Sequence, residues 1–209
     1  MGLGLITYDE LMSRWEPNAR ERLERAALAL FAENGYDATT VAQIADRAGL
    51  TKSTFFRHFA DKREVLFGGQ ERLTEAFTSA IGTAPPSATT TECLSAALEA
   101  VEVVFTPQRH EFALQRRAVI AANSELQERE LLKMARLGLA VAEALRARGA
   151  DDVTARLAAE VGMLAFSTAF ARWATPGNEE PFPPIAHAAL RELQDRAAAL
   201  GSAVAGTPA

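Results

Sequence analysis

Hydroxyl and basic side chains gather in one short stretch of the chain, Thr51–Arg63. The part from Lys52 onward holds four Lys or Arg residues against a single acid, Asp61. Grouped cations of this kind bind phosphate groups, and short polar side chains beside them can reach base edges. These residues therefore predict recognition of a nucleic acid. The side chains that we expect to make the contacts are those of Thr40, Thr51, Lys52, Ser53, Thr54, Phe56, Arg57, His58 and Lys62.

Two short helices joined by a tight turn would position these side chains. Thr40 and Gln43 have the spacing of a capping box, which predicts a helix start at that point. Gly49 ends this helix, since glycine accepts the left-handed backbone of a helix terminus. Thr51 is a good N-cap for a second helix, whose first exposed turn carries Lys52–Thr54. The pattern predicts a helix-turn-helix whose second helix presents side chains to bases.

One helix before this motif and one after it complete the predicted head. Asn18 with Glu21 can cap the preceding helix, whose apolar residues recur on one face up to Asn34. Asp61 with Glu64 repeats the capping spacing and predicts the start of the following helix. The predicted head is therefore a three-helix unit from which a further helix runs out.

These boundaries divide the first part of the chain into three segments. We expect an N-terminal arm at residues 1–17, a helix-turn-helix DNA-binding domain at 18–67, and a connector helix at 62–80. Lys62 falls in the first turn of that connector, where the helix dipole favours anions. A basic residue suits this place if a phosphate docks on the helix start.

A long ordered pattern in the first third of the chain resembles the N-terminal DNA-binding domain of the TetR family of bacterial transcriptional regulators. It reads AALALFAENGYDATTVAQIADRAGLTKSTFFRHFADKREVL. The resemblance implies operator DNA as a partner, repression as the usual mode, and dimerisation through the last two helices. The position of Phe56 is often Tyr in the family, with its hydroxyl on a phosphate. We therefore expect Arg57 or His58 to take over that contact.

The rest of the chain is helical, without strand signals. Thr83–Thr91 is rich in Pro, Ser and Thr and separates the head and connector from a second domain. We expect a ligand-binding and dimerisation domain at residues 83–200 and a disordered tail at 201–209. The predicted fold is all-α, with a helix-turn-helix head, a C-terminal helical domain and about nine helices in total.

The end of the second domain carries the prediction of a dimer. Val161–Ala171 is apolar almost all round, which predicts burial on every side. In so small a domain, this favours a partner chain that covers one face. The last helix, Ile185–Leu200, has an apolar stripe of its own. We therefore expect a homodimer through these two helices, and the alternative is that both complete the core of a single chain.

Basic residues on an otherwise apolar helix predict a ligand site. Arg109 and Arg116 are seven residues apart and share one helical face. Turned inward, they could hold an anionic head group while apolar walls take an alkyl or aromatic tail. The segment ELLKMARL is also similar to a TetR subgroup with members that sense acyl-CoA or fatty-acid-like ligands. The candidate ligand-binding residues are Phe105, Arg109, Arg116, Met134, Met163, Phe166, Phe170 and Trp173. The alternative is that the arginines pair on the surface with one of the glutamates Glu111, Glu125 and Glu128.

Composition and missing motifs argue against other classes of function. The net charge is −5, yet residues 17–68 carry eight Lys or Arg against seven acids, a local balance of +1. The single cysteine, Cys93, permits no internal disulfide and fits a reducing cytoplasm. The sequence contains no HExxH, CxxC, HxH, GxSxG or P-loop motif, so we expect no enzyme, no metal and no cofactor. We also expect no signal peptide and no apolar run of membrane-spanning length.

The sequence thus predicts a dimeric, sequence-specific DNA-binding regulator in the cytoplasm. We expect a repressor that a small hydrophobic or amphipathic effector releases from its operator. An alternative is an effector-independent architectural or nucleoid DNA-binding protein. A third class is a partner-binding protein that retains a degenerate head.

Overall fold

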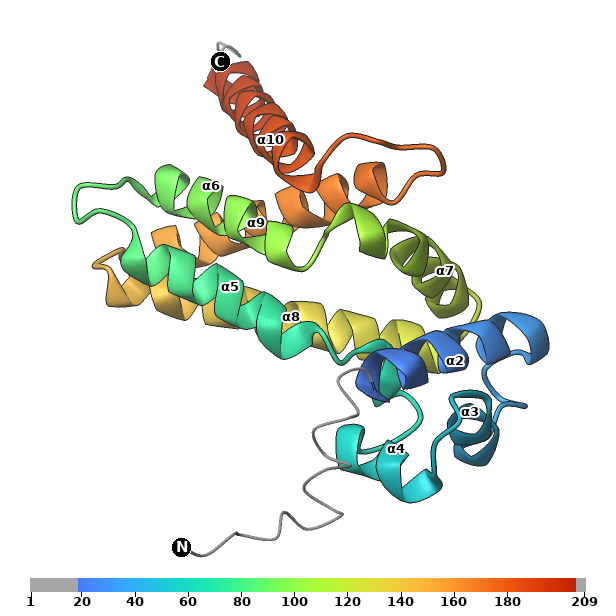
Figure 1. Ribbon diagram of the computed structural model, residues 1–209. Coiled ribbons are helices and arrows are strands. Elements are labelled where there is room, and N and C mark those ends of the chain that lie inside the picture. The colour runs from blue at the N-terminus through green and yellow to red at the C-terminus, as the bar shows by residue number, and fades with distance from the viewer. Residues whose placement is uncertain (1–18, 206–209) are drawn as a thin grey trace, which may run out of the picture. The chain divides into compact units, whose positions relative to one another are not determined.

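The structure is a computed structural model that describes residues 19–205, with side chains to residue 200. The predicted arm at 1–17, the cap at Asn18 and residues 206–209 lie outside the described residues. Within them the chain forms nine α-helices and no strand, which confirms the all-α prediction (Figure 1). The chain divides into two compact units, Met1–Gly68 and Gly69–Ala209.

In its described part, residues 19–68, the first unit, here called the head, has three α-helices and a short 3₁₀ turn (Figure 1). They are α2 (Ala19–Asn34), α3 (Val41–Arg47), α4 (Lys52–His58) and η1 (Glu64–Leu66). Each contributes apolar side chains to one small core. The most deeply buried of these are Leu23, Ala27, Leu28, Ile44, Ala45, Phe55, Phe59 and Val65.

Local hydrogen bonds fix the ends of α3 and α4 as the sequence predicted. The Thr40 hydroxyl accepts from the Gln43 amide at 3.3 Å, and Gln43 Oε1 accepts from the Thr40 amide at 2.8 Å, so the capping box is complete. Gly49 has φ +65°, the left-handed conformation that stops α3. The Thr51 hydroxyl accepts from the Thr54 amide at 3.1 Å and caps α4.

A long-range contact that the sequence did not reveal also holds the turn at Gly49. Arg22 on α2 donates from Nη2 to the carbonyl oxygens of Ala48 and Gly49. A Cβ atom at Gly49 would lie 2.9 Å from that nitrogen. Glycine is therefore required here for its backbone conformation, and a side chain would also crowd the guanidinium.

The predicted connector helix at 62–80 is wrong in its bounds. Only η1 forms before the chain leaves the helical path at Phe67, and α5 (Gln70–Thr83) begins after Gly68 and Gly69. Arg20 Nη2 donates to the Gly68 carbonyl at 2.7 Å, and a Cβ atom at Gly68 would collide with the same nitrogen. This close approach favours glycine where helical periodicity alone predicted a continuous helix.

Over residues 69–205, the second unit has six α-helices, which pack around one apolar core (Figure 1). After α5 the elements are α6 (Thr90–Ala100), η2 (Val101–Val103), η3 (Pro107–Arg109), α7 (His110–Ala121), α8 (Ser124–Ala147), α9 (Asp152–Trp173) and α10 (Phe182–Ala205). α9 packs against α8, α6 and α10, and α5 packs against α6 and α8. α9 is therefore the helix around which this unit is built.

The last helix is longer than predicted at both ends. α10 begins at Phe182, because Pro183 and Pro184 lie in its first turn, where a helix needs no backbone N–H donor. It continues to Ala205, so the prediction of a disordered tail from residue 201 is wrong for the described part of that segment.

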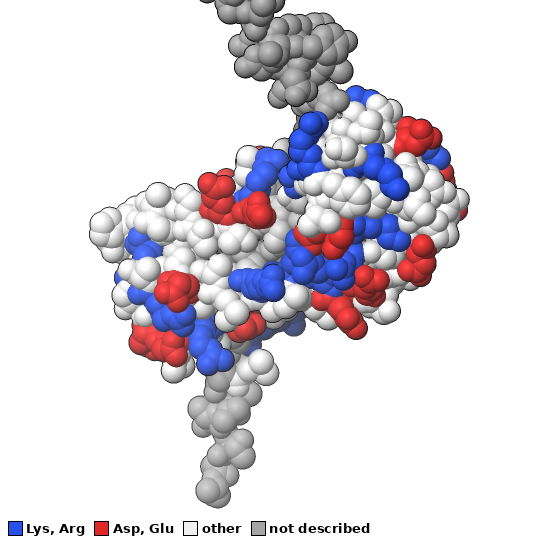
Figure 2. All heavy atoms as spheres, turned by 90° about the horizontal axis from the view of Figure 1, so that it is seen from below, with Lys and Arg blue, Asp and Glu red and all other residues white. Residues whose placement is uncertain are grey.

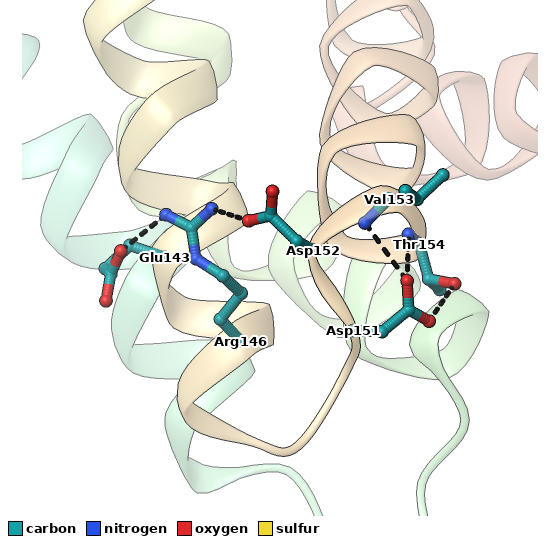
Figure 3. A network of polar contacts seen from close by, with 6 residues as sticks. All are labelled: Glu143, Arg146, Asp151, Asp152, Val153 and Thr154. Carbon is teal, nitrogen blue, oxygen red and sulfur yellow. Dashed lines mark hydrogen bonds and ion pairs between the residues drawn. The ribbon is translucent and has the colours of Figure 1, made fainter.

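A polar network joins α8 to α9 (Figure 3). Asp151 caps α9 by accepting from the Thr154 hydroxyl at 2.6 Å and from its amide at 3.0 Å, and these bonds lower the pKa of the Asp151 carboxyl. Arg146 at the end of α8 lies 2.6 Å from Glu143 and 2.7 Å from Asp152. The turn between α8 and α9 is thus fixed by a cap and ion pairs.

Within the described residues, α9 is the one helix long and apolar enough to cross a membrane by length and composition. This corrects the expectation that no apolar run reaches such a length. A core helix satisfies the same criteria, and the small residues of α9 do lie in the core of the second unit. They are Ala155, Ala159, Gly162, Ala165 and Ala169.

Candidate nucleic-acid interface

The recognition surface predicted from the sequence is one face of α4. Phe55 and Phe59 point into the core of the head, with ring centroids 5.4 Å apart. The opposite face exposes side chains from the start and middle of the helix, namely those of Lys52, Ser53, Phe56 and Arg57. α4 is thus anchored by two aromatic rings and leaves its predicted contact residues accessible.

Two threonines of the predicted site, Thr40 and Thr51, are the N-caps of α3 and α4. Thr51 Oγ1 lies 3.0 Å from Thr54 Oγ1 and also caps α4. The Thr40 hydroxyl donates to Gln43 Oε1 at 2.9 Å. Thr40 and Thr51 therefore hold the first turns of α3 and α4 in position, where the backbone N–H groups of a helix start can face an anion.

Lys62 takes a different position from the one predicted. Its ammonium donates to the Tyr36 carbonyl at 2.7 Å and to the Thr39 carbonyl at 2.9 Å. It also lies 4.0 Å from the centroid of the Tyr36 ring, in a cation–π contact. Two of its three N–H bonds are therefore used inside the head, where they tie the end of the helix-turn-helix to the turn after α2.

Thr39 shows why this turn receives the lysine. Its hydroxyl is buried and donates toward the carbonyls of Gly35 at 2.8 Å and Leu30 at 3.2 Å. The chain after α2 thereby folds back and presents the backbone oxygens of residues 36 and 39 together. No pattern in the sequence indicated this arrangement, because every residue has a backbone carbonyl and the residue type does not show which carbonyl accepts a hydrogen bond.

Arg57 and His58 were expected to bind the phosphate that a Tyr at position 56 would bind. The two side chains lie in different surroundings. Arg57 is exposed, whereas His58 is half-buried with its ring 6.4 Å from the Phe59 ring. Arg57 is thus better placed for a phosphate at the surface.

Several other cations of the head form ion pairs within it. Arg47 binds both carboxylate oxygens of Glu33, at 3.0 and 2.7 Å, and Arg63 lies 2.9 Å from Asp61. Figure 2 shows one face of the molecule, on which groups of Lys and Arg alternate with Asp and Glu. Lys52 makes no ion pair within the described part of the chain, so its charge is available to a partner.

In the second unit, the aromatic candidates for ligand binding pack against one another. Phe105 stacks on Phe182, with centroids 4.7 Å apart and planes at 21°, and lies 5.4–5.7 Å from the rings of Phe166, Phe170 and Trp173. Phe166 and Trp173 are buried. The structure brings these residues together, but as an aromatic cluster in the core, and Phe182 is a member that the sequence did not indicate.

The two candidate arginines contact different residues in the structure. Arg116 forms a two-pronged ion pair with Glu130 on α8, at 2.6 and 3.2 Å. Its side chain is 18% exposed and that of Glu130 is 27% exposed. This half-buried partner differs from the three glutamates considered from the sequence. Arg109 lies over the Phe112 ring, 5.1 Å from its centroid.

The remaining candidates, Met134 and Met163, are half-buried against the same core. Two further side chains of α7 bind the end of α9. His110 Nε2 forms a hydrogen bond with the Trp173 carbonyl at 2.9 Å, and Arg117 donates to the carbonyls of Ala171 and Ala174 at 3.3 Å each. These contacts satisfy the free carbonyls of a helix terminus.

Comparison with known proteins agrees with this geometry. Residues 24–67 match the family of bacterial regulatory proteins named tetR. The transcriptional regulator TcmR of Streptomyces glaucescens is 42% identical over 82 residues, which cover 39% of this chain and 36% of TcmR. This aligned part is well under two thirds of that relative's length.

Solved structures resemble the chain over a greater length. FadR of Bacillus subtilis, in complex with stearoyl-CoA, has 21% identity and a TM-score of 0.55 over 83% of this chain and 96% of its own. FadR of Thermus thermophilus, a TetR-family repressor in complex with lauroyl-CoA, has 23% identity and a TM-score of 0.52 over 84% of this chain and 93% of its own. At these identities the likeness shows the fold.

The capped α4, its anchoring rings and the turn at Gly49 define a helix-turn-helix head. Residues 24–67 carry the sequence match to the tetR family, so the head is of the type found in TetR-family transcriptional regulators.

The positions of Lys52 and Lys62 predict different effects on stability. Lys62→Ala removes two charge-assisted hydrogen bonds, so we expect the free energy of unfolding of the head to fall by about 1–3 kcal/mol. Lys52→Ala is the matched control and should change it by less than about 0.5 kcal/mol. Urea unfolding followed by circular dichroism measures both. Equal stability of the two variants would contradict the role assigned to Lys62.

Proposed function

We propose that this chain is a dimeric, sequence-specific DNA-binding repressor in the cytoplasm, released from its operator by a small hydrophobic or amphipathic effector. The observation that carries the proposal is α4, whose Phe55 and Phe59 lie in the core while Lys52, Ser53 and Arg57 face solvent. A helix anchored and exposed in this way can enter the major groove of DNA. Lys52 and Arg57 then contact phosphates, and Ser53 reaches base edges.

The dimer is supported by the outer face of α9. Val153, Leu157 and Leu164 are 76%, 64% and 53% exposed, on the helix whose small residues fill the core. Of these, Leu164 lies in the segment Val161–Ala171 that was predicted to be buried on every side, so one chain covers only part of that segment's apolar surface. A second copy of α9 and α10 would cover the outer part and form a four-helix interface.

A two-fold dimer determines how the heads meet DNA. Two copies of α4 would enter successive major grooves, with half-site centres roughly 34–36 Å apart, or farther for a longer site. The operator would then be an inverted repeat, because the symmetry of the protein is imposed on the bases that it contacts.

The effector proposal rests on the aromatic cluster and its connection to α5. Phe77 on α5 packs edge-on against Phe166 on α9, with centroids 5.6 Å apart, and Phe166 contacts Phe105 and Phe182. A ligand that displaced these rings would shift α5, which begins two residues after the last residue of the head. Release from DNA requires the ligand to bind the DNA-incompetent state more tightly.

The close packing of the same rings favours a second candidate function. Phe166, Trp173 and Phe182 are buried and in contact, as in an ordinary core. A regulator without an effector, or an architectural DNA-binding protein, would retain such a core. Sensitivity of DNA binding to a ligand separates the two candidates.

Salt dependence tests the phosphate contact assigned to Lys52. Lys52→Ala should weaken binding to DNA of any sequence and reduce the slope of log K against log salt by about one unit per subunit, because one phosphate contact is lost. Fluorescence anisotropy over a salt series provides the slope. Asp37→Asn is the control, because Asp37 is an exposed acid of the head outside α4. This variant should not reduce the salt slope. An unchanged slope in Lys52→Ala would remove this residue from the interface.

Charge placed on the outer face of α9 tests the dimer. The double variant Leu157→Glu with Leu164→Glu should convert a dimer into a monomer at micromolar concentration, because four carboxylates would meet in the interface. Leu139→Glu is the control, since Leu139 is more exposed than either leucine but lies on α8. Light scattering gives the masses. A monomeric wild type, or a dimeric double variant, would contradict the assignment.

Acyl-CoA binding tests the effector, since two proteins of the same fold hold such ligands. Lauroyl-CoA or stearoyl-CoA should lower the affinity for operator DNA by about 5- to 150-fold, the usual range of coupling between sites. Coenzyme A without an acyl chain is the control and should have no effect, because the aromatic cluster binds the chain. An affinity that neither acyl-CoA changes would contradict this effector class and favour the second candidate.

A further inference from the structure

The exposed aromatic ring of α4 has no part in the phosphate contacts assigned to Lys52 and Arg57. Phe56 is 56% exposed, and it is the one large apolar side chain of the head with such exposure among residues 19–68. All other large apolar residues of that segment are buried or half-buried. An isolated exposed ring is ordinary on most surfaces, but this one lies in the middle of the helix proposed to enter DNA.

The position and orientation of the ring are well defined. Phe56 follows Lys52 by four residues, so the two side chains share one face of α4. Its ring packs edge-on against the buried Phe55 ring, with centroids 5.5 Å apart and planes at 83°. This contact orients Phe56 before DNA binds and reduces the conformational entropy that binding costs.

The chemistry of a phenyl ring limits what it can bind in a groove. It carries no donor for a phosphate oxygen and no group for the polar edges of bases. The apolar group that the major groove offers is the C5-methyl of thymine, which side chains such as phenylalanine contact. Resting on the proposed function, we propose that Phe56 reads thymine through this methyl group and is a specificity-determining residue of the head.

The surroundings of Phe56 favour DNA over a protein partner. Its exposed neighbours on α4 are Lys52, Ser53 and Arg57, two of them cationic. An apolar protein interface would need a contiguous patch of apolar side chains, which one ring does not supply. A ring flanked by cations instead matches a groove lined by phosphates, with methyl groups on its floor.

Removing single methyl groups from the DNA tests this inference. The full-length protein is used to enrich a preferred duplex from a randomised pool, and each thymine of a half-site is then replaced by deoxyuridine. At one or two positions, wild-type affinity should fall about three- to fivefold, as expected for the loss of one methyl contact. In Phe56→Ala, thymine and uracil duplexes should bind equally at those positions.

Arg57→Ala serves as the matched control, because it lies beside Phe56 but should keep the discrimination between thymine and uracil. Phe56 is outside the core and is assigned no phosphate contact, so Phe56→Ala should retain the thermal unfolding of the wild type and the slope of log K against log salt. The inference is overturned if no thymine position responds in the wild type, or if Phe56→Ala responds as the wild type does. Failure to enrich any sequence would instead contradict the proposed function, and this inference with it.

Discussion

The turn at Gly49 is the constraint on which the head depends. Its left-handed backbone sets the direction in which α4 leaves α3, and Arg22 holds that turn by binding the carbonyls of residues 48 and 49. Lys62 ties the other end of the motif to the turn after α2. With both ends held, α4 can bury Phe55 and still expose its opposite face, which is what reading DNA requires.

Caps and turns could be predicted from the sequence because their partners are a few residues apart. Thr40 with Gln43, and Thr51, form the capping bonds that were predicted, and Gly49 has the predicted left-handed backbone. Contacts between distant residues could not be predicted in this way. Arg22 and Lys62 bind carbonyl oxygens 23–27 positions away, and backbone acceptors have no signature in residue type. The break at Gly68 depends on a similar contact with Arg20.

The second unit shows the same difference between local pattern and packing. Phe105, Phe166 and Trp173, which the sequence offered as ligand-binding candidates, do lie in one region, but residue type and spacing could not distinguish a pocket wall from a core. That depends on what fills the space between the rings, and here Phe182 stacks on Phe105. The all-round apolar character of α9 likewise indicated burial on every side, whereas one chain covers only the inner face.

In the function that we propose, two copies of a fixed, exposed α4 read DNA together. Enrichment of preferred duplexes from a randomised pool by the full-length protein, followed by sequencing, tests it most directly. We expect an inverted repeat whose half-sites lie about one helical turn apart or somewhat more, roughly 34–36 Å between centres at the shorter spacing. A pool without enrichment, or an enriched site without internal symmetry, would contradict it.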